Sequence, residues 1–425
     1  MAHKKIREYD AKRILANYLK EKSSEFQFEP HLLHVDADTA LSGKEKQSPW
    51  VTQTKLVAKP DQLIKRRGKH GLLGINLDWA AAKAWIAERT DKTVTLDEIT
   101  DTLNTFLVEP FVPHEQENEH YIAITTSKKG DEILFCHEGG VDVGDVDAKA
   151  KRLFVPIETQ TTPDEVVKKL LSDISATDKA LLAQFICELY TFFVDTNCAF
   201  LEINPLVFVD GKVFPLDLAI QLDDTGVGES GKYWGEIEFP SPFGRTLSAE
   251  EKHVEELDSK TGASLKLTVL NQNGRVWTMV AGGGASVIYA DTVVDLGAGP
   301  ELANYGEYSG NPNEEFTYEY ARTILDLMTR HQDARGKVLL IGGGIANFTD
   351  VAKTFKGIIK TLKEFQVKIR EHDIRIFVRR GGPNYQEGLA NMKKLGAEIN
   401  IPIEVYGPET HMTYIVRAAL KGEHR

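Results

Sequence analysis

The second half of the chain repeats one pattern four times: a short apolar run, a turn that contains glycine, and a segment with apolar residues at helical spacing. The four copies occupy residues 275–296, 337–362, 374–395 and 401–420. A strand that is followed each time by a helix is typical of a parallel sheet, because the helix carries the chain back to start the next strand in the same direction. We therefore expect a parallel α/β domain with helices on both faces, and ligands bound beyond the carboxyl ends of its strands.

Glycine turns stand where these strands are expected to end. Gly282, Gly283 and Gly284 follow the first strand, residues 342–344 are a second glycine triplet, and Arg380 precedes two further glycines after the third strand. Glycine allows close approach of the backbone to a ligand, and a helix that starts there offers free N–H groups to an anion. The same turns could serve only for tight packing of helix on strand. Neither triplet continues as G-x-G-x-x-G, so a nicotinamide enzyme is not favoured. We expect both triplets to open helices.

Charge and cysteine content exclude several classes of protein. The sequence has 63 acidic and 51 basic residues, a formal net charge of −12, which disfavours a role in coating nucleic acid. Its three cysteines show no paired spacing, which argues against a disulfide framework or a zinc site and suits a reducing compartment. No apolar run reaches the ~18 residues that span a bilayer, and the start of the chain is too charged for a secretory signal. We therefore expect a cytoplasmic protein that binds neither nucleic acid nor membrane.

The first half of the chain mixes strands and helices without a regular repeat. An amphipathic helix is predicted over 5–20. Strands are predicted over 55–60, 71–77, 106–113, 121–127, 132–140, 200–208 and 213–223, the last two joined by a hairpin turn at 209–212, and helices from Pro163 and over 177–194. These elements predict a second α/β domain.

A stretch rich in glycine, proline and serine, residues 225–249, predicts a linker, with the domain boundary near residue 245. Within it, residues 226–232 resemble a phosphate-binding P-loop. That loop is not expected to bind nucleotide, because Tyr233 stands where a Mg²⁺-binding serine or threonine is needed and no apolar strand precedes the loop. We therefore expect two domains, residues 1–244 and 245–425.

Residues with the chemistry for binding a nucleoside triphosphate are scattered through the first half. Cations must neutralise the phosphates when the γ-phosphoryl group leaves, and Mg²⁺ needs hard oxygen donors. The candidates are Lys59, Arg67, Gly68, Glu109, Glu119, Asn204 and Asp217. Asn204 and Asp217 fall on neighbouring strands of the predicted hairpin. Taken singly, the pattern favours an ordinary surface, turn or strand-end residue over a binding role for each candidate.

Longer strings of sequence resemble a known family. The motifs at 59–61 (KPD), 67–69 (RGK), 109–112 (EPFV), 138–140 (EGG) and 202–206 (EINPL) resemble an ATP-grasp domain of the kind found in the nucleotide-binding subunit of succinyl-CoA synthetase. Residues 278–292, 303–310, 341–352 and 378–389 resemble the ATP-citrate lyase family more specifically, and the likeness runs from about residue 5 to 420. The resemblance implies an ATP-grasp domain of two lobes, followed by a flavodoxin-like parallel α/β domain.

The resemblance also implies roles for individual residues. Lys59, Arg67 and Gly68 would contact phosphates, Glu109, Pro110 and Val112 would form the hinge that holds adenine, and Glu119 would bind the ribose. Asn204 and Asp217 would hold Mg²⁺, and Asp258 matches a further metal position. Ser309, Gly310, Asn347, Phe348, Thr349 and Arg380 would bind citrate, which agrees with the anion-binding chemistry of the glycine turns and of arginine. The helix expected near Ala285, after Gly282, Gly283 and Gly284, would face a phosphohistidine.

In this family, as the resemblance implies, the γ-phosphoryl group of ATP passes to a histidine and then to citrate. CoA displaces the phosphate, and citryl-CoA is cleaved to acetyl-CoA and oxaloacetate. The acceptor histidine normally lies in a Gly-His-Ala-Gly loop, and none of the 12 histidines here has that setting. We therefore expect a partner subunit that carries the phosphohistidine, most CoA contacts and a citrate-synthase-like cleavage module. The chain would then be the smaller, ATP- and citrate-binding subunit of a hetero-oligomer.

Three other functions stay open from the sequence. A citryl-CoA synthetase subunit would make the same thioester and leave its cleavage to another enzyme. A succinate-specific ligase is less favoured, because Arg380 and residues 347–349 suit a larger acid. A non-catalytic nucleotide sensor is disfavoured, because the charged candidates of the first half are all present.

Overall fold

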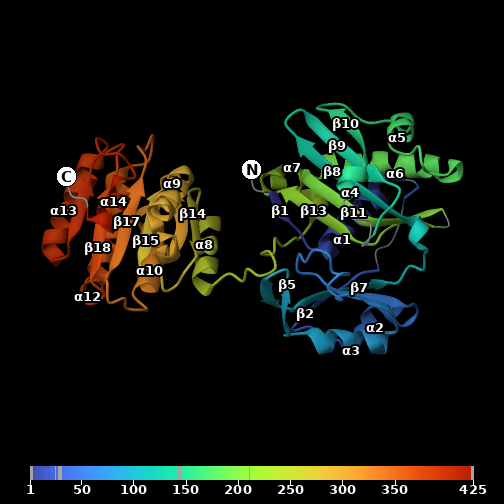
Figure 1. Ribbon diagram of the computed structural model, residues 1–425, viewed down its shortest axis with the longest axis horizontal. Coiled ribbons are helices and arrows are strands. Elements are labelled where there is room, and N and C mark those ends of the chain that lie inside the picture. The colour runs from blue at the N-terminus through green and yellow to red at the C-terminus, as the bar shows by residue number, and fades with distance from the viewer. Residues whose placement is uncertain (1–2, 24, 27–30, 141–145, 210, 423–425) are drawn as a thin grey trace. The chain divides into compact units, whose positions relative to one another are not determined.

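The computed structural model describes residues 3–23, 25–26, 31–140, 146–209 and 211–422. Contacts divide the chain into two units, Met1–Thr246 and Leu247–Arg425 (Figure 1). Each unit has hydrophobic cores of its own.

The smaller lobe of the first unit is an antiparallel sheet with helix α3 (Trp79–Arg89) packed against it. Strand order is β2-β7-β3-β4, with β2 at Leu33–Asp36, β7 at Thr105–Pro110, β3 at Leu56–Pro60 and β4 at Gly74–Leu77. A core that includes Phe106, Val108 and Ile86 joins the helix to the sheet. The lobe also contains α2 (Lys44–Gln47) and a hairpin of β5 (Thr93–Leu96) and β6 (Ile99–Thr102).

The larger lobe is a seven-stranded antiparallel sheet in the order β1-β13-β11-β8-β9-β10, with β12 paired to β11. Its strands are β1 (His3–Lys5), β8 (Glu119–Ser127), β9 (Gly130–Cys136), β10 (Lys151–Pro156), β11 (Cys198–Val209), β12 (Lys212–Pro215) and β13 (Leu218–Asp223). Its helices are α1 (Glu8–Lys22), α4 (Val146–Lys149), α5 (Pro163–Lys169), α6 (Ala176–Asp195) and α7 (Val227–Trp234). Residues of α1 and α6 form one large core with one face of this sheet.

Two expectations for this unit are wrong. The strand expected over 213–223 is two strands, because the chain turns away between β12 and β13 at Leu216–Asp217. Most of the P-loop-like stretch expected as linker is helix α7, which Trp234 anchors: its ring is 1% exposed, and its Nε1 donates to the Thr196 carbonyl at 2.9 Å. The predicted hairpin turn includes Asp210, which lies outside the described residues.

The second unit contains the predicted parallel sheet. Strands β15 (Val276–Ala281), β17 (Lys337–Gly343), β18 (Ile374–Arg379) and β19 (Ile403–Tyr406) pair in chain order, all parallel. Strands β14 (Ser264–Val269) and β16 (Asn304–Ser309) form an antiparallel pair. This pair lies beside β15, because the buried Asn304 side chain exchanges hydrogen bonds with both backbone groups of Thr278 on β15. The order β16-β15-β17-β18-β19 is the flavodoxin-like arrangement.

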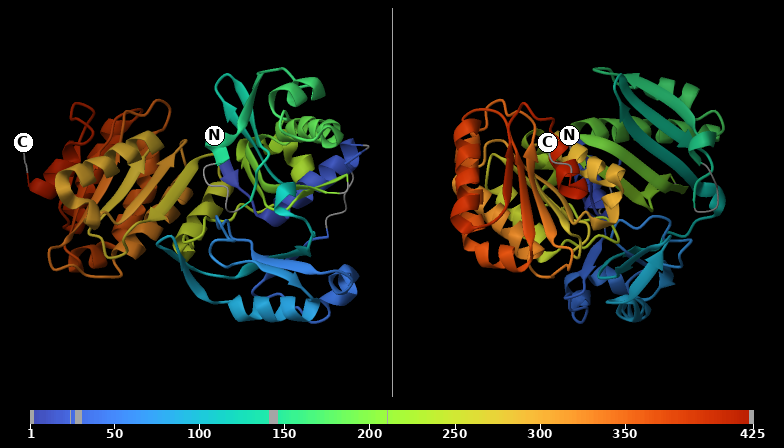
Figure 2. Two further views of the ribbon diagram at one scale, coloured as in Figure 1. Left: turned by 45° about the vertical axis from the view of Figure 1, so that its right-hand side comes forward. Right: turned by 60° about the vertical axis from the view of Figure 1, so that its left-hand side comes forward.

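Helices cover both faces of this sheet (Figure 2). One face packs on α8 (Ala249–Ser259), α10 (Glu314–Met328), α11 (Val351–Glu364), α12 (Gln366–Glu371) and α13 (Tyr385–Ile399), the other on α9 (Gly283–Val293) and α14 (Tyr414–Lys421). Alternate residues of a strand serve the two faces: on β15, Trp277 belongs to the first core and Val276 to the second.

The glycine triplets behave differently from each other. The first opens a helix, since α9 starts at Gly283. The second does not: β17 runs through Gly343, and a loop then leads to Val351, where Asp350 caps α11 by accepting from the Lys353 amide at 2.9 Å. The expectation that both triplets open helices is therefore wrong for the second.

Candidate functional site

Lys59 stands at the end of β3, inside a buried ionic network of the first unit. Lys59 is 3% exposed, and its ammonium donates to Glu8 Oε1, Glu109 Oε1 and the Leu216 carbonyl, each at 2.7 Å. An ammonium group has three protons, so these contacts use all of them.

Helix α1 supplies two members of the network that sequence reasoning missed. Besides Glu8, it contributes Lys12, whose ammonium lies 2.6 Å from Glu109 Oε2, 2.8 Å from Glu8 Oε1 and 2.9 Å from the Leu216 carbonyl. The start of α1 is fixed by Asp61, which accepts from the amides of Glu8 and Tyr9. The available signal was an i,i+4 pair of opposite charges on the apolar face of the helix.

Arg67 completes this network from the loop after β3. Its Nη2 donates to Glu8 and, at 2.7 Å, to Asp217 Oδ1, while Nη1 donates to the Pro60 carbonyl at 3.0 Å. Its Nε is buried and has no hydrogen-bond partner among the described residues. Arg67 therefore keeps capacity for a further acceptor. Beside it, Gly68 lies in a turn and its carbonyl accepts from the Gly71 amide at 3.1 Å.

The network favours the charged forms of Glu8 and Lys59. Burial alone would raise the pKa of Glu8, but the nearby cations Arg67, Lys12 and Lys59 outweigh it and lower that pKa far below the usual value. Burial likewise opposes the charge on Lys59, and Glu109 and Glu8 outweigh it, so the pKa of Lys59 is raised. The six side chains of Glu8, Lys12, Lys59, Arg67, Glu109 and Asp217 thus form a cluster of three cations and three anions, which we call the six-residue network.

A second group of predicted residues lies on the neighbouring strands of the larger lobe. The backbone N–H of Asn204 donates to the backbone carbonyl of Asp217 at 3.0 Å, which sets the two predicted metal ligands side by side. Asn204 Oδ1 accepts from the Gly140 amide at 2.7 Å, and Glu119 lies so close to Gly140 that a Cβ there would meet its carboxylate at 2.0 Å. His114 Nε2 is 3.0 Å from Glu119 Oε1. Both lobes therefore contribute predicted nucleotide-binding residues.

The predicted hinge residues lie at the end of β7 and just after it. Pro110 pairs with Leu56 of β3, and the Val112 carbonyl lies 2.7 Å from His114 Nδ1. Glu109 directs its carboxylate to Lys59 and Lys12.

These residues fit a magnesium–nucleotide complex. Carboxylate and amide oxygens are ligands that Mg²⁺ accepts, and the ion commonly completes its shell with phosphate oxygens and water. Asn204 and Asp217 offer such oxygens, and Arg67 Nε offers a buried donor to an anion. Within the described residues, no group of three His, Cys, Asp or Glu side chains is placed to hold a metal ion.

In the second unit, Arg379 ends β18 and Arg380 follows it. Both are buried, but they differ in their contacts. Arg379 donates from Nε, Nη1 and Nη2 to the carbonyls of Thr410, Gly343 and Pro408. Arg380 donates from Nη1 to the Gly344 carbonyl at 2.9 Å, and its buried Nε has no partner among the described residues. The first arginine therefore fixes loops, whereas the second has donors left for an anion.

The other predicted citrate residues gather at the same edge of the sheet. Ser309 ends β16, and Gly310 follows it in a left-handed conformation at φ +72°. The loop after β17 holds Asn347, the 68% exposed Phe348 and the buried Thr349. That loop is tied to the arginine turn by the Ala346 amide, which donates to the Gly381 carbonyl at 2.9 Å.

Sequence reasoning missed Tyr308 at this edge. Its hydroxyl is buried with no hydrogen-bond partner among the described residues. Burial raises the pKa of this phenol, and Arg380 acts in the opposite sense. The residue carries no signal in the sequence, since a tyrosine on an amphipathic strand is ordinary core.

The first glycine triplet faces a carboxylate. Gly282 has φ +101°, Gly284 has open space where a Cβ would stand, and a Cβ on Gly283 would lie 2.4 Å from Glu307 Oε2. The helix starts at Gly283 rather than near Ala285. Glu307 itself accepts from Ser264 Oγ at 2.8 Å. The N-terminus of α9 is thus lined by glycine, and the Glu307 carboxylate lies beside it.

Asp258 lies apart from these loops, at the end of α8. Its Oδ1 accepts from the Leu265 amide at 2.7 Å, and its Oδ2 is 2.6 Å from Lys266 Nζ. The structure gives this predicted metal ligand a lysine and a backbone amide as partners.

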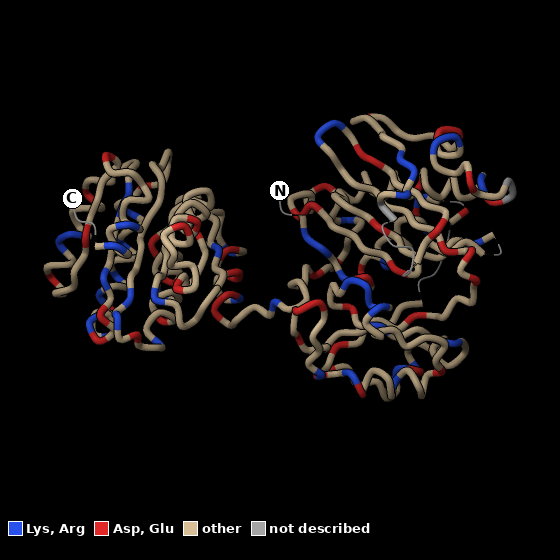
Figure 3. The backbone as a smooth tube through the Cα atoms, viewed as in Figure 1, with Lys and Arg blue, Asp and Glu red and all other residues tan. Residues whose placement is uncertain are grey.

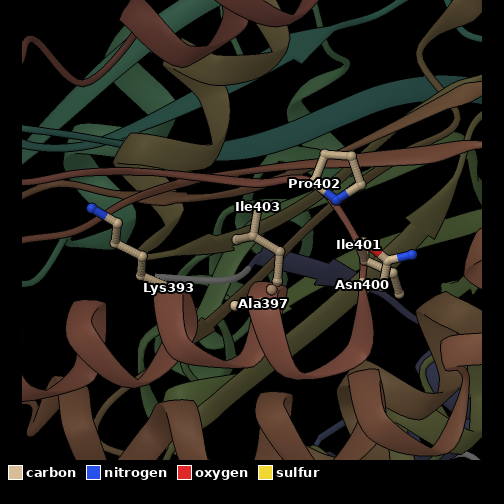
Figure 4. Close-up of a pocket in the computed structure, with 7 residues that line it drawn as sticks. Lys393, Ala397, Asn400, Ile401, Pro402 and Ile403 are labelled. Atoms are coloured by element: carbon tan, nitrogen blue, oxygen red, sulfur yellow. The ribbon is translucent and has the colours of Figure 1, made fainter.

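A surface pocket of about 350 Å³ lies elsewhere in the second unit (Figure 4). It is lined by the last turns of α13 and by residues 400–403, which lead into β19. This is the amino end of the strand, opposite to the edge with Arg380, and Lys393 is the one charged side chain in its lining. Acidic and basic residues are interspersed along both units (Figure 3). In the described part of the chain, no helix has the length and apolar character needed to cross a bilayer.

Comparison with known proteins gives matches over nearly the full chain. The family model for the ATP-citrate synthase ATP-grasp domain matches residues 2–234, and the model for the ATP citrate lyase citrate-binding domain matches residues 245–422. ATP-citrate synthase of Bos taurus is 51% identical over 420 residues, which are 99% of this chain but 38% of the bovine protein. The chain therefore spans well under half the length of that relative.

Other relatives are matched over almost their whole length. Probable ATP-citrate synthase subunit 2 of Schizosaccharomyces pombe is 48% identical, with 99% of this chain and 98% of the yeast protein covered. The structure of ATP citrate lyase from Methanothrix soehngenii in complex with citrate and coenzyme A superimposes with a TM-score of 0.91 at 51% identity, covering 99% of this chain and all of that one. With both family models and these identities, the chain belongs to the ATP-citrate lyase family, with an ATP-grasp domain followed by a citrate-binding domain.

Proposed function

We propose that this chain is the ATP- and citrate-binding subunit of an ATP-citrate lyase. The observation that carries the proposal is the convergence of Lys59, Arg67, Asn204 and Asp217 from both lobes of the ATP-grasp unit, which provides cations for phosphates beside oxygens for a metal ion. Glu119, Val112 and Pro110 flank the same region, as a nucleoside would require. Relatives named as ATP-citrate synthase, and a matched structure solved with citrate and coenzyme A, support it.

Magnesium has a defined role in this proposal. Asn204 and Asp217 would hold the ion, which would supply positive charge against the negative charge that develops as the γ-phosphoryl group leaves. Lys59 and Arg67 would hold the same phosphates, and Gly68 would approach them through its backbone. For Asp258 to bind a metal ion, the Lys266 ammonium, which lies 2.6 Å from its carboxylate, would have to move away.

Citrate would bind in the second unit, at the carboxyl edge of the parallel sheet. Arg380 would pair with one carboxylate through its free donors, and Ser309, Gly310, Asn347 and Thr349 would surround the rest of the acid. Phe348, largely exposed, would close over it. The N-terminus of α9, with Gly282, Gly283 and Gly284, would stabilise the negative charge of a phosphohistidine.

The chemistry then runs through a second subunit. A histidine nitrogen of that partner attacks the γ-phosphorus, the bond to the β-phosphate oxygen breaks, and ADP leaves. A citrate carboxylate takes the phosphoryl group, CoA sulfur displaces phosphate from the acyl carbon, and citryl-CoA is cleaved to acetyl-CoA and oxaloacetate. Relatives covered almost end to end are named as a subunit or an alpha chain, which supports a hetero-oligomer. The free thiols of Cys136, Cys187 and Cys198 suit the cytoplasm.

One experiment separates the lyase from a citryl-CoA synthetase. The chain is combined with the citrate-synthase-like partner chain of the same organism, MgATP, citrate and CoA, and the products are quantified. Oxaloacetate and acetyl-CoA in equal amounts are expected. Accumulation of citryl-CoA with no oxaloacetate would favour the synthetase, and the absence of any CoA thioester would contradict both.

A further inference from the structure

The ammonium of Lys59 has no proton to spare as the structure has it. Its three contacts, to Glu8, Glu109 and the Leu216 carbonyl, are all 2.7 Å long. A phosphate oxygen that accepts a hydrogen bond from Lys59 must therefore replace one of these acceptors. Replacing a carboxylate with a phosphate leaves a buried carboxylate short of a cation, and an unpaired buried charge is costly.

Lys12 is placed to neutralise the carboxylates that Lys59 would leave. Its ammonium contacts Glu109 Oε2 at 2.6 Å and Glu8 Oε1 at 2.8 Å, the same two carboxylates that Lys59 contacts. Among the described residues, Lys12 and Lys59 are the cations that reach both. A lysine 4% exposed on the inner face of a helix is unusual unless its charge is paired.

A count of charge in the six-residue network also indicates that Lys12 compensates the two carboxylates when Lys59 leaves them. Its three cations balance three carboxylates. When Lys59 and Arg67 turn to phosphate and Asp217 turns to Mg²⁺, what remains is Glu8 and Glu109 with Lys12 between them. Without Lys12 these two carboxylates would retain Lys59 and would repel the incoming phosphates.

We propose that Lys12 is a positioning residue for nucleotide binding: it holds Glu8 and Glu109 so that Lys59 is free to turn from carboxylate to phosphate. This inference rests on the proposed ATP site. Lys12 has no contact with the nucleotide in this account. It acts through Lys59, and its charge rather than its bulk is what matters.

The test is a double-mutant cycle of Lys12 and Glu109. Calorimetry measures the affinity of the full chain for Mg²⁺–AMPPNP in each variant. Lys12→Met should weaken binding by at least roughly tenfold, because Lys59 stays bound to its carboxylates. In the Glu109→Gln background, where one of those carboxylates is neutral, the same change should cost less than about threefold. Lys12→Arg should restore binding to near the wild-type affinity, since it keeps the charge.

Controls keep the test decisive if a variant folds poorly. Lys22→Met changes the last turn of the same helix, where the side chain is 46% exposed, and should leave affinity unchanged. Hydrogen exchange of peptides from α6, which packs in the same core as α1, gauges the fraction of the first unit that is folded in every sample. If Lys12→Met does not fold, Lys12→Gln and Lys12→Arg form the comparison of neutral with charged side chains.

The outcomes distinguish the inference from the function on which it rests. Failure of the wild type to bind Mg²⁺–AMPPNP would overturn the ATP site and the inference together. Normal binding by the wild type, with equal affinity in Lys12→Met, would overturn the inference alone. A loss of the same size in both backgrounds would also overturn it, because a purely structural role predicts no dependence on Glu109.

Discussion

The ammonium of Lys59 lies 2.7 Å from a carboxylate oxygen of Glu109, across the antiparallel strands β3 and β7. The resemblance in sequence places these residues at opposite ends of a nucleotide, one at its phosphates and the other in the adenine hinge. In the structure they are partners in one buried ion pair. We therefore expect any contact of residue 109 with adenine to be made by its backbone, while its carboxylate controls the charge and mobility of Lys59.

Replacing Asp217 with alanine should abolish Mg²⁺-dependent phosphoryl transfer to the partner chain. The change removes one expected metal ligand, and it also frees Arg67 of one acceptor, now at 2.7 Å. Transfer of radiolabelled phosphate from MgATP to the partner measures this directly. Asp224→Ala is a suitable control, because it removes a carboxylate just after β13 whose ion pair among the described residues is with Lys4, at 3.1 Å. Full transfer by Asp217→Ala would exclude the metal role.

Arg380→Ala should weaken citrate binding by about a hundredfold while leaving nucleotide binding near normal, because the buried guanidinium is the main charged partner proposed for the acid. Calorimetric titrations of citrate and of Mg²⁺–AMPPNP check both parts. Arg322→Ala, at a half-exposed position on α10, should affect neither titration. Unchanged citrate affinity in Arg380→Ala would show that the acid binds elsewhere.

The second glycine triplet allows a matched comparison of stability. A Cβ at position 342 would lie 2.3 Å from the buried ring of Tyr289, whereas a Cβ at position 344 has nothing within 4 Å. Gly342→Ala should therefore lower the free energy of unfolding of the second unit by about 2–3 kcal/mol through overpacking, and Gly344→Ala should change it by less than about 1 kcal/mol. Denaturant unfolding of both variants tests this. Equal stabilities would show that the contact between Gly342 and Tyr289 is not tight.

Glu8 should make the stability of the first unit depend on pH. Its folded-state pKa is depressed from the ordinary value of 4.5, so its contribution is fully present above that value and is lost as the pH falls toward the folded pKa. Glu8→Gln should cost about 3 kcal/mol at neutral pH, because it leaves buried cations short of an anion. The difference from wild type should shrink as the pH is lowered below about 4.

Hydrogen exchange of peptides from α1 and β7, followed by mass spectrometry over a pH series, measures that difference locally. Glu21→Gln, at a 67% exposed position on the same helix, provides the control and should track the wild type. A difference between Glu8→Gln and wild type that does not change with pH would mean that the pKa of Glu8 is the same in the folded and unfolded chains.

The parallel sheet was predictable from sequence because each strand and helix carries its own periodic pattern, and the pattern recurs four times. Predictions that depended on a local string alone were less secure. The stretch at 226–232 looks like a linker because of its glycines, but burial of Trp234 outweighs their helix-breaking tendency. The glycines at 342–343 look like a helix start, but hydrogen bonds to β15 keep them in the strand.

The proximity of some candidate residues was predictable in the same way. Asn204 on β11 and Asp217 just before β13 come together because these two strands pair, and the alternation of apolar residues predicts both strands. Glu8 and Lys12 were not foreseen, because the helix pattern gives no hint that their charges meet Glu109 and Lys59, which come from distant strands. Tyr308 was not predicted for the same reason. Whether its hydroxyl has a hydrogen-bond partner among the described residues can be seen only when the positions of its neighbours are known.

The most direct test of the account is a crystal structure of the chain with Mg²⁺–AMPPNP. We expect phosphate oxygens within hydrogen-bond distance of Lys59 Nζ and Arg67, the metal ion on Asn204 and Asp217, and Lys12 still in contact with Glu8 and Glu109. A nucleotide bound elsewhere, or one bound between the lobes while Lys59 keeps all three of its present acceptors, would contradict the account.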